Sequence, residues 1–218
     1  MASTVTAQFL AEQLEVADLL QAGRDHMLEP QDLPGRYGRV VRAVDRLLAA
    51  VQGVAVVAGG WAVWRHGYLG RLTQDVDIVV PAALVDELLR AAAASGFEVV
   101  PRGAGMWPRL WHKESDIQVD LLPEGATPGT SAQPAPTEIP HPGRLGGRAG
   151  PLKYIELAGL VELKLAAGRA RDDGDVVELI LANPDQIDAV RQHLAAVHEQ
   201  YVARFDELRA RAQRQTDR

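Results

Sequence analysis

The chain has 218 residues, of which 47% are hydrophobic and 24% charged, and its formal net charge is -6; this is the composition of an ordinary globular protein. The acidic balance argues against a protein that coats nucleic acid non-specifically, because phosphate binding needs a net basic surface. With no cysteine in the sequence, disulfides, thiolate metal sites and cysteine nucleophiles are excluded.

The first part of the chain, residues 1–52, is predicted to be helical. Apolar residues recur at helical spacing across residues 5–22 and again across 37–51, which predicts two amphipathic helices. A connection rich in proline and glycine separates them.

Residues 53–123 change to a pattern of short β-branched runs that alternate with a helical stretch. The run VAVVA is bounded by glycine residues, and DVDIVV is stopped by Pro81, as expected of buried strands. We predict an α+β fold in which a mixed sheet is flanked by helices, with further helical segments at both ends of the chain. The expected strands are 54–58, 75–81, 97–102, 108–113 and 116–123, with a helix over 82–96.

A Gly/Pro-rich loop is predicted over residues 124–150, and a helical region over 151–218. Within that region the expected helices cover 151–168, 172–182 and about 184–213, the second preceding a proline in the cap sequence NPDQ. The apolar stripe of the last helix either covers the domain or makes a dimer contact.

Three aspartates interrupt the apolar strands of the predicted sheet. Side chains alternate along a strand, so Asp75 and Asp77 point the same way, about 6.5 to 7 Å apart. Asp120 lies on the polar side of a later strand, and pairing of the two strands brings all three carboxylates together. Carboxylates this close cannot all stay ionised without compensation. Oxygen ligands without His or Cys suit Mg²⁺ or Mn²⁺. The alternative is that the pair lies exposed at a strand end.

Gly59 and Gly60 end one strand and open a short helix just before these acids. Unpaired backbone N–H groups at the start of a helix favour phosphate oxygens. Two glycines at a strand end are also what any tight turn needs, so the signal lies in their combination with the D-x-D strand and the later aspartate.

The stretch AGGWAVWRHGYLGRLTQDVDIVV resembles the glycine-rich and D-x-D signature of the polymerase-beta-type nucleotidyltransferase superfamily. Its opening GGWAV is similar to the branch that adenylylates aminoglycosides and lincosamides. The run RLTQDVDIVV is similar to minimal enzymes and to nucleotidyltransferase toxins of abortive-infection systems, as is the later segment ELKLAAGRARDDGDVVELI. The resemblance covers roughly residues 54–182.

The resemblance implies metal-dependent catalysis by the three acids. Asp75 and Asp77 would hold the metals, and Asp120 would be a third metal ligand and the base, or base-positioning group, for the attacking hydroxyl. The residues implied to contact the nucleotide are Gly59, Gly60, Arg71, Thr73, Lys164 and Arg169. The second turn residue is glycine where many members have serine, so one hydroxyl contact is missing.

Several other polar and aromatic residues are better explained by packing or solvation. His66 is predicted to be packed, Asp116 to be a turn acid, and the acids that follow Arg171 to form a charge cluster. Trp107, Trp111 and His112 are expected to pack in the sheet rather than to form a base-stacking surface.

The sequence therefore predicts a metal-dependent nucleotidyltransferase that moves a nucleoside monophosphate from an NTP to a hydroxyl acceptor and releases pyrophosphate. The acceptor is open: an RNA 3′ end such as tRNA, a small molecule as in antibiotic resistance, or a protein side chain. The alternative is a non-catalytic nucleotide-binding or toxin–antitoxin partner module that kept the fold. We expect a monomer or homodimer in the cytoplasm, without membrane contact, since no apolar run reaches the length of a membrane helix.

Overall fold

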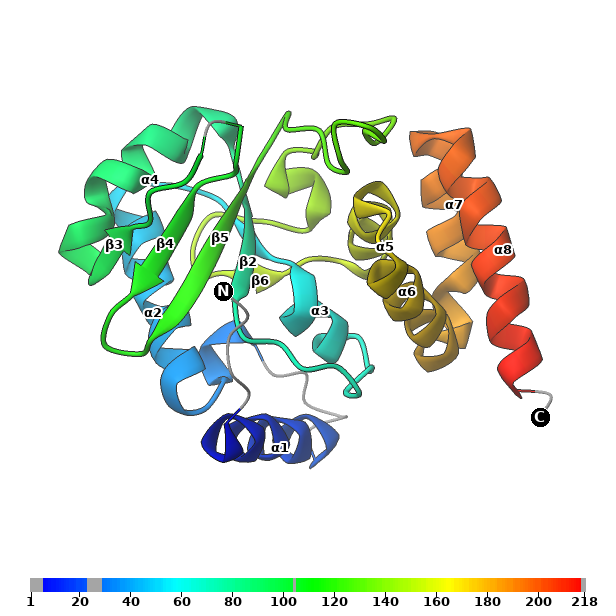
Figure 1. Ribbon diagram of the computed structural model, residues 1–218, viewed down its shortest axis with the longest axis horizontal. Coiled ribbons are helices and arrows are strands. Elements are labelled where there is room, and N and C mark those ends of the chain that lie inside the picture. Colours follow the sequence, from blue (N-terminus) through cyan, green and yellow to red (C-terminus); the bar gives the residue numbers. More distant parts are fainter. Residues whose placement is uncertain (1–5, 23–28, 104, 217–218) are drawn as a thin grey trace.

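The protein is built around a mixed six-stranded sheet with helices on both faces (Figure 1). This computed structural model describes residues 6–22, 29–103 and 105–216. The strand order is β3-β4-β5-β2-β1-β6. The strands are β1 (Val56–Val57), β2 (Val76–Val80), β3 (Phe97–Val99), β4 (Arg109–His112), β5 (Ile117–Pro123) and β6 (Lys153–Tyr154). β2 pairs with β5 and β1 with β6 in parallel, and the other pairs are antiparallel, which confirms the predicted mixed sheet.

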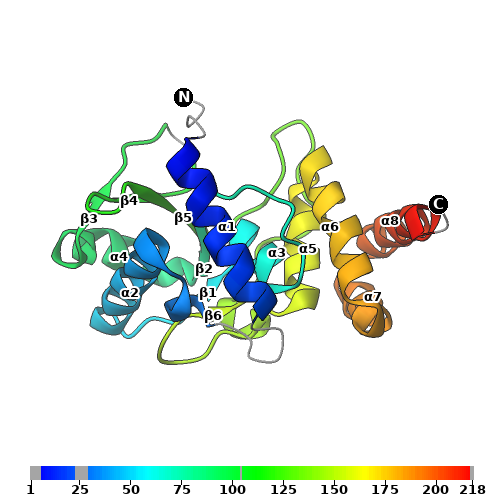
Figure 2. The same cartoon turned by 90° about the horizontal axis from the view of Figure 1, so that it is seen from below.

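Helices lie on both sides of the sheet, and α1 runs below it (Figures 1 and 2). Their bounds are α1 (Ala7–Ala22), α2 (Gly35–Ala50), α3 (Gly59–Arg65), α4 (Val85–Ala91), α5 (Leu157–Ala167), α6 (Ala170–Ala182), α7 (Ile187–Val197) and α8 (Glu199–Thr216). Short 3-10 turns cover Pro30–Asp32, Ala82–Leu84, Ala92–Ser95, Pro142–Leu145 and Pro184–Gln186. α2 and α4 pack on one face, whereas α5 to α8 form a helical layer on the other.

Alternation along β2 and β5 divides the core between these faces. Val76 and Ile78 pack with Val119 in the core under α2, while Val79 belongs to the core on the α5 side. The intervening aspartates of both strands therefore face the α5 side, away from α2. α2 follows its predicted amphipathic pattern, with Val40, Val44 and Leu47 among its buried residues.

Several expected elements differ from the structure. The helix expected over 82–96 is α4 with a 3-10 turn on either side, and the strand expected over 97–102 ends at Val99. Residues 151–156, predicted to be helical, include β6, and α5 begins only at Leu157. The expected strand 54–58 is reduced to Val56–Val57. The single long helix predicted over 184–213 is two helices, because His198 has extended backbone angles (φ -162°, ψ 137°). The imidazole Nδ1 of His198 accepts a hydrogen bond from the Gln200 N–H at 3.2 Å, which satisfies a free donor in the first turn of α8.

The break at His198 lets α8 turn back along α7 and pack against α6 (Figure 1). The apolar stripe of the predicted long helix is consequently used within the chain: Ile187, Val190, Leu194 and Tyr201 are all buried in the core on the α5 side. None of the described helices combines the length and the apolar character needed to span a bilayer.

Candidate active site

Three carboxylates meet at the centre of the sheet, as the alternation of the strands predicts. Asp75 immediately precedes β2, Asp77 lies within it, and Asp120 is the residue of β5 directly paired with Asp77. One carboxylate oxygen from each residue lies within 4.8 Å of the others. All three side chains are half-buried, so the cluster is open on one side to an approaching ion.

The electrostatics of the cluster favour a cation. Burial, followed by the charges of Asp75 and Asp120, raises the pKa of Asp77 to about 7, against the opposing effect of Lys164 and Arg71. A divalent cation would remove this penalty. The donors are all carboxylate oxygens, which is the chemistry that suits Mg²⁺ or Mn²⁺.

Gly59 lies beside the carboxylate cluster at a position that only glycine can occupy without strain. It opens α3 with φ +60°, and a Cβ atom placed on it would overlap the Asp77 carboxylate. At Gly60 a Cβ would overlap the hydroxyl-bearing side chain of Thr73. Both glycines are thus required for close packing of the turn against the acid-bearing strand.

Thr73 and Arg71 lie behind this turn. Thr73 is 2% exposed, its N–H donates to Gln13 Oε1 at 3.1 Å, and its hydroxyl has no hydrogen-bond partner in the described part of the chain. Arg71 forms an ion pair with Asp175. Neither side chain, nor Gly60, lines the pocket described below.

Lys164 belongs to a buried network of charges rather than pointing freely into solvent. Its ammonium donates to Asp172 at 3.0 Å and to Asp175 at 2.6 Å, and the three side chains are at most 5% exposed. Arg71 and Arg169 complete the network by binding Asp175 and Asp172 respectively. Burial alone would raise the pKa of Asp172, but the hydrogen bond from Arg169 and the charge of Lys164 hold that pKa below its usual value.

Arg109 and Arg102 were not identified from the sequence. Arg109 Nη2 donates to Asp120 Oδ2 at 2.5 Å, Nε binds the other oxygen, and Arg102 Nη1 lies 3.5 Å from Oδ1. The hydrogen bond to Asp120 raises the pKa of Arg109. The signal that reveals Arg109 is the β4–β5 register, in which it directly faces Asp120; side chains paired in this way share a sheet face.

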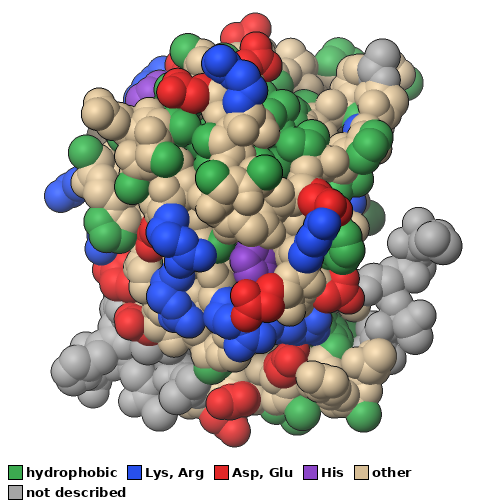
Figure 3. Space-filling view, turned by 90° about the vertical axis from the view of Figure 1, so that its left-hand side faces the viewer, with side chains coloured by type: hydrophobic (Ala, Val, Ile, Leu, Met, Phe, Trp, Pro, Cys, Tyr) green, Lys and Arg blue, Asp and Glu red, His purple; other side chains and the backbone are tan. Residues whose placement is uncertain are grey.

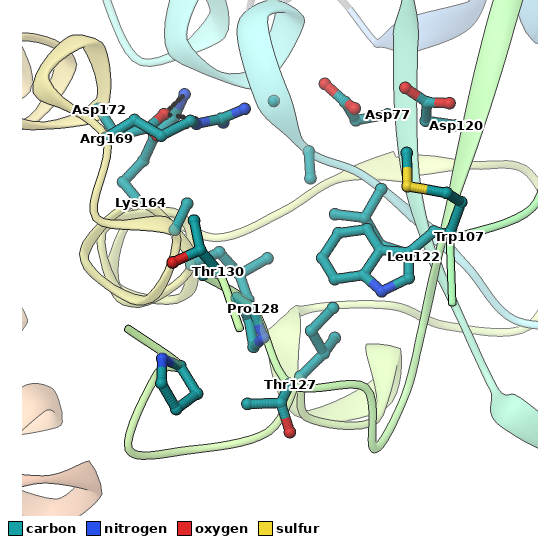
Figure 4. Close-up of a pocket in the computed structure, with 18 of the residues that line it drawn as sticks. Asp77, Trp107, Asp120, Leu122, Thr127, Pro128, Thr130, Lys164, Arg169 and Asp172 are labelled. Carbon is teal, nitrogen blue, oxygen red and sulfur yellow. Dashed lines mark hydrogen bonds and ion pairs between the residues drawn. The ribbon is translucent and has the colours of Figure 1, made fainter. Parts of the chain in front are cut away.

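A pocket of ≈ 670 Å³ opens beside the carboxylates. Figure 4 shows Asp77 and Asp120 on one side, with Trp107 and Leu122 below them, and Lys164, Arg169 and Asp172 across from them. The loop predicted over 124–150 supplies the remaining wall, through Thr127, Pro128 and Thr130. Of the residues expected to contact a nucleotide, Gly59, Lys164 and Arg169 line the pocket.

Of the other residues singled out from the sequence, Asp172 and Trp107 line this pocket, whereas His66, Asp116 and His112 do not. His66 is packed, its Nε2 2.9 Å from the Ile155 carbonyl oxygen, and Asp116 is a turn residue (φ +49°) that accepts from Trp111 Nε1 at 3.1 Å. His112 is buried on the opposite sheet face. Trp107, which was expected to pack, is packed against the core on the α5 side and also lines the pocket.

Comparison with known proteins gives similarity at the level of structure. No protein-family model matches the chain, and no curated protein matches it. Among solved structures, it is similar to the crystal structure of ANT(2'')-Ia in complex with adenylyl-2''-tobramycin, with 16% identity, a TM-score of 0.43, and 81% of this chain and 97% of that chain covered. It is also similar to the solution structure of the antibiotic-resistance factor ANT(2'')-Ia, with 15% identity, a TM-score of 0.38, and 82% and 93% covered.

Proposed function

We propose that the protein is a metal-dependent nucleotidyltransferase that transfers a nucleoside monophosphate from an NTP to a hydroxyl acceptor, with release of pyrophosphate. The observation that carries the proposal is the meeting of Asp75, Asp77 and Asp120 within 4.8 Å, beside Gly59 at the wall of a large pocket. Bound Mg²⁺ or Mn²⁺ would neutralise charge on the α-phosphate and on the leaving group.

In this proposal the acceptor oxygen forms a bond to the α-phosphorus as the bond to pyrophosphate breaks, and pyrophosphate leaves with the electron pair. Asp120 takes the acceptor proton or positions the group that takes it. Arg109 occupies two of the roughly four lone-pair positions of that carboxylate, which fixes its orientation and leaves two for a metal or a hydroxyl.

The pocket residues divide the binding of the nucleotide between them. Arg169, whose side chain is 60% exposed, is proposed to contact phosphate oxygens directly, since guanidinium groups bind phosphate in a planar fork. Lys164 is committed to Asp172 and Asp175 and is proposed to hold Arg169 and the acids in place. Gly60, Arg71 and Thr73 are proposed to support the turn from behind, which keeps Gly59 close to the phosphates.

The charges of the pocket weigh on the choice of acceptor. Its cations are Arg102, Arg109, Lys164 and Arg169, and its acids, Asp77, Asp120 and Asp172, are paired with these cations or needed for metal. No acid among these lining residues is left over for a polycationic acceptor such as an aminoglycoside. We therefore propose a neutral or anionic hydroxyl compound, an RNA 3′ end included, with antibiotic modification as the less favoured role.

A binding experiment and a turnover experiment test the function. Calorimetry of the purified chain with a non-hydrolysable NTP should give binding that requires Mn²⁺ or Mg²⁺, and Asp77→Asn and Asp120→Asn should weaken this binding. Asp116→Asn is the matched control, because Asp116 is a turn acid outside the cluster. Absence of metal-dependent NTP binding, or unchanged binding in Asp77→Asn, would falsify the proposal.

Labelled NTPs incubated with tRNA, protein or aminoglycoside pools then identify the acceptor by label transfer. Loss of one metal ligand should lower turnover by about 10²–10³-fold, the size of effect expected for one electrostatic group at a reaction centre. Metal-dependent NTP binding without transfer to any pool would favour the non-catalytic binding module over the enzyme.

A further inference from the structure

A cluster of basic side chains lies on the sheet face opposite the three carboxylates. Leu110 and His112 pair with Val119 and Ile117 of β5, which pack in the core under α2. Paired residues share a face, so His112 points toward α2 while Arg109 points toward the candidate active site. The sheet therefore separates the two sites.

α2 presents a stripe of arginines beside this histidine. Arg39, Arg42 and Arg46 are spaced three and four residues apart, which places them on one side of the helix, and all three are exposed. Figure 3 shows Lys and Arg side chains arranged around a histidine on the side of the molecule where α2, α4 and β3 lie. A hollow of ≈ 190 Å³ is lined by these three arginines together with His112 and Glu114.

His112 is a buried polar group without a complete set of partners. It is 4% exposed, its ring contacts Phe97 edge-on at 5.0 Å between centroids, and its Nδ1 has no hydrogen-bond partner in the described part of the chain. Burial, aided by the charges of Arg46 and Arg39 and opposed by Glu114, lowers the pKa of His112. Buried polar atoms without a partner are rare in native structures, so this one needs a physical explanation.

The arginines are only partly neutralised by the protein. Arg39 lies 3.7 Å from Glu114, with side chains 47% and 76% exposed, and Arg42 donates to the Gln31 carbonyl at 3.0 Å. Arg46 makes no hydrogen bond or ion pair with any described residue. Three positive charges and one negative charge leave the hollow with a net charge of about +2, in a chain whose net charge is -6.

We propose that this hollow binds a terminal phosphate group, either inorganic phosphate or the phosphomonoester of a small molecule. A phosphomonoester carries about -1.5 to -2 charges at neutral pH, which matches the local +2, and guanidinium groups bind its oxygens in forked pairs. A phosphodiester backbone carries one charge per phosphate and needs a longer basic track. Glu114 at the rim of the hollow interrupts such a track.

The test is a titration of the full chain with inorganic phosphate, in EDTA, followed by NMR of the His112 imidazole. Phosphate should raise the apparent pKa of His112, because a bound anion stabilises the imidazolium. Arg46→Gln should weaken phosphate binding by at least about tenfold, the scale of one charge-assisted hydrogen bond. The matched control is Arg90→Gln on α4, whose Nε donates to the Asp86 carbonyl oxygen at 3.2 Å; this variant should bind phosphate as the unmodified chain does.

Three further ligands identify the source of the phosphate. If AMP shifts the His112 resonances as phosphate does and adenosine does not, the ligand is a phosphomonoester. If phosphate shifts them and AMP does not, the ligand is the free phosphate ion. An RNA oligomer without a terminal phosphate should leave the resonances unchanged. The proposal fails if phosphate and AMP leave His112 unaffected, if Arg46→Gln binds normally, or if only that RNA binds. Because EDTA removes divalent metal and His112 reports on the far face, none of these outcomes depends on the proposed transferase.

Discussion

At the scale of single residues, the strictest requirement falls on Gly59. Its φ of +60° and the overlap of a Cβ with Asp77 are two separate penalties. Gly59→Ala should lower the free energy of unfolding by roughly 1–2 kcal/mol through the left-handed backbone alone, and should also displace Asp77. We expect metal-dependent NTP binding to be lost, as measured by calorimetry.

Gly35→Ala separates the two penalties. Gly35 has nearly the same backbone angle, φ +59°, but nothing lies within 4 Å of its added Cβ. This variant should share the loss of stability and keep NTP binding. If both variants bind equally well, the contact between Gly59 and Asp77 has no functional role.

Asp77→Asn should stabilise the metal-free protein while removing its response to metal. The charge of Asp77 is opposed by burial and by its two acidic neighbours, so in EDTA at about pH 8 the neutral amide should raise Tm, by roughly 2–4 °C for each kcal/mol relieved. Addition of Mn²⁺ should then raise the Tm of the unmodified chain and leave that of the variant unchanged. Scanning calorimetry in EDTA measures the two Tm values. If Asp77→Asn and the unmodified chain have the same Tm there, the acids do not repel one another.

The convergence of the acids could be predicted from sequence, and their arginine partners could not. A period of two puts Asp75 and Asp77 on one face and Asp120 on the polar side of its own strand, and their meeting was predicted on the condition that the two strands pair. The contact between Arg109 and Asp120 depends on the register of β4 against β5, which no local pattern specifies. Likewise, the pairing of Lys164 with its two acids depends on how α5 and α6 pack.

At the scale of elements, this junction of α5 and α6 is held by buried charge. Lys164→Met would leave Asp172 and Asp175 with one cation fewer, and breaking a buried pair in this way costs about 3–5 kcal/mol. Lys153→Met is the exposed counterpart, because Lys153 pairs with Glu29 at 3.1 Å and both side chains are more than 40% exposed. This substitution should cost about 0–1 kcal/mol. Urea unfolding of both variants measures the difference, and equal costs would mean that the network is not structural.

The same network predicts how stability depends on pH. The pKa of Asp172 is lowered in the folded state from an ordinary value of 3.8. The contribution of Asp172 to the free energy of unfolding is therefore complete above pH 3.8, and it is lost as the pH falls through the lower pKa of the folded state. Unfolding free energy should fall on acidification below about pH 4, and Asp172→Asn, less stable at neutral pH, should show a shallower acid slope. If the unfolding free energies of Asp172→Asn and of the unmodified chain fall equally steeply with decreasing pH, groups other than Asp172 cause the sensitivity to acid.

Elements defined by strong local patterns were predicted well, and those defined by distant contacts were not. α2 and the strands β2 and β5 follow directly from their apolar periodicity. β6 has two residues, and it is a strand only because Val56 and Val57 lie beside it. The break at His198 interrupts an apolar stripe that continues on both sides, because the return of α8 onto α6 is a tertiary preference.

At the scale of the whole molecule, the sheet carries one core on each face and one proposed site on each face. The Gly/Pro-rich segment predicted as a loop over 124–150 forms a wall of the pocket instead of a simple connection, through Thr127, Pro128 and Thr130. The division of the chain at residue 123 stays a prediction, although the sheet continues into β6 beyond it.

The packing of the C-terminal helices predicts that the protein is a monomer in solution. The apolar stripe whose use in a dimer was left open is covered within one chain: Ile187, Val190, Leu194 and Tyr201 are at most 5% exposed, and Val197 is partly buried. Burial of this stripe has already removed the apolar surface that would drive association. Light scattering after gel filtration should give a mass near 23.6 kDa that does not change with concentration. Twice that mass would overturn the prediction, and Leu14→Ser, at the 66% exposed Leu14 of α1, would then test whether α1 makes the contact.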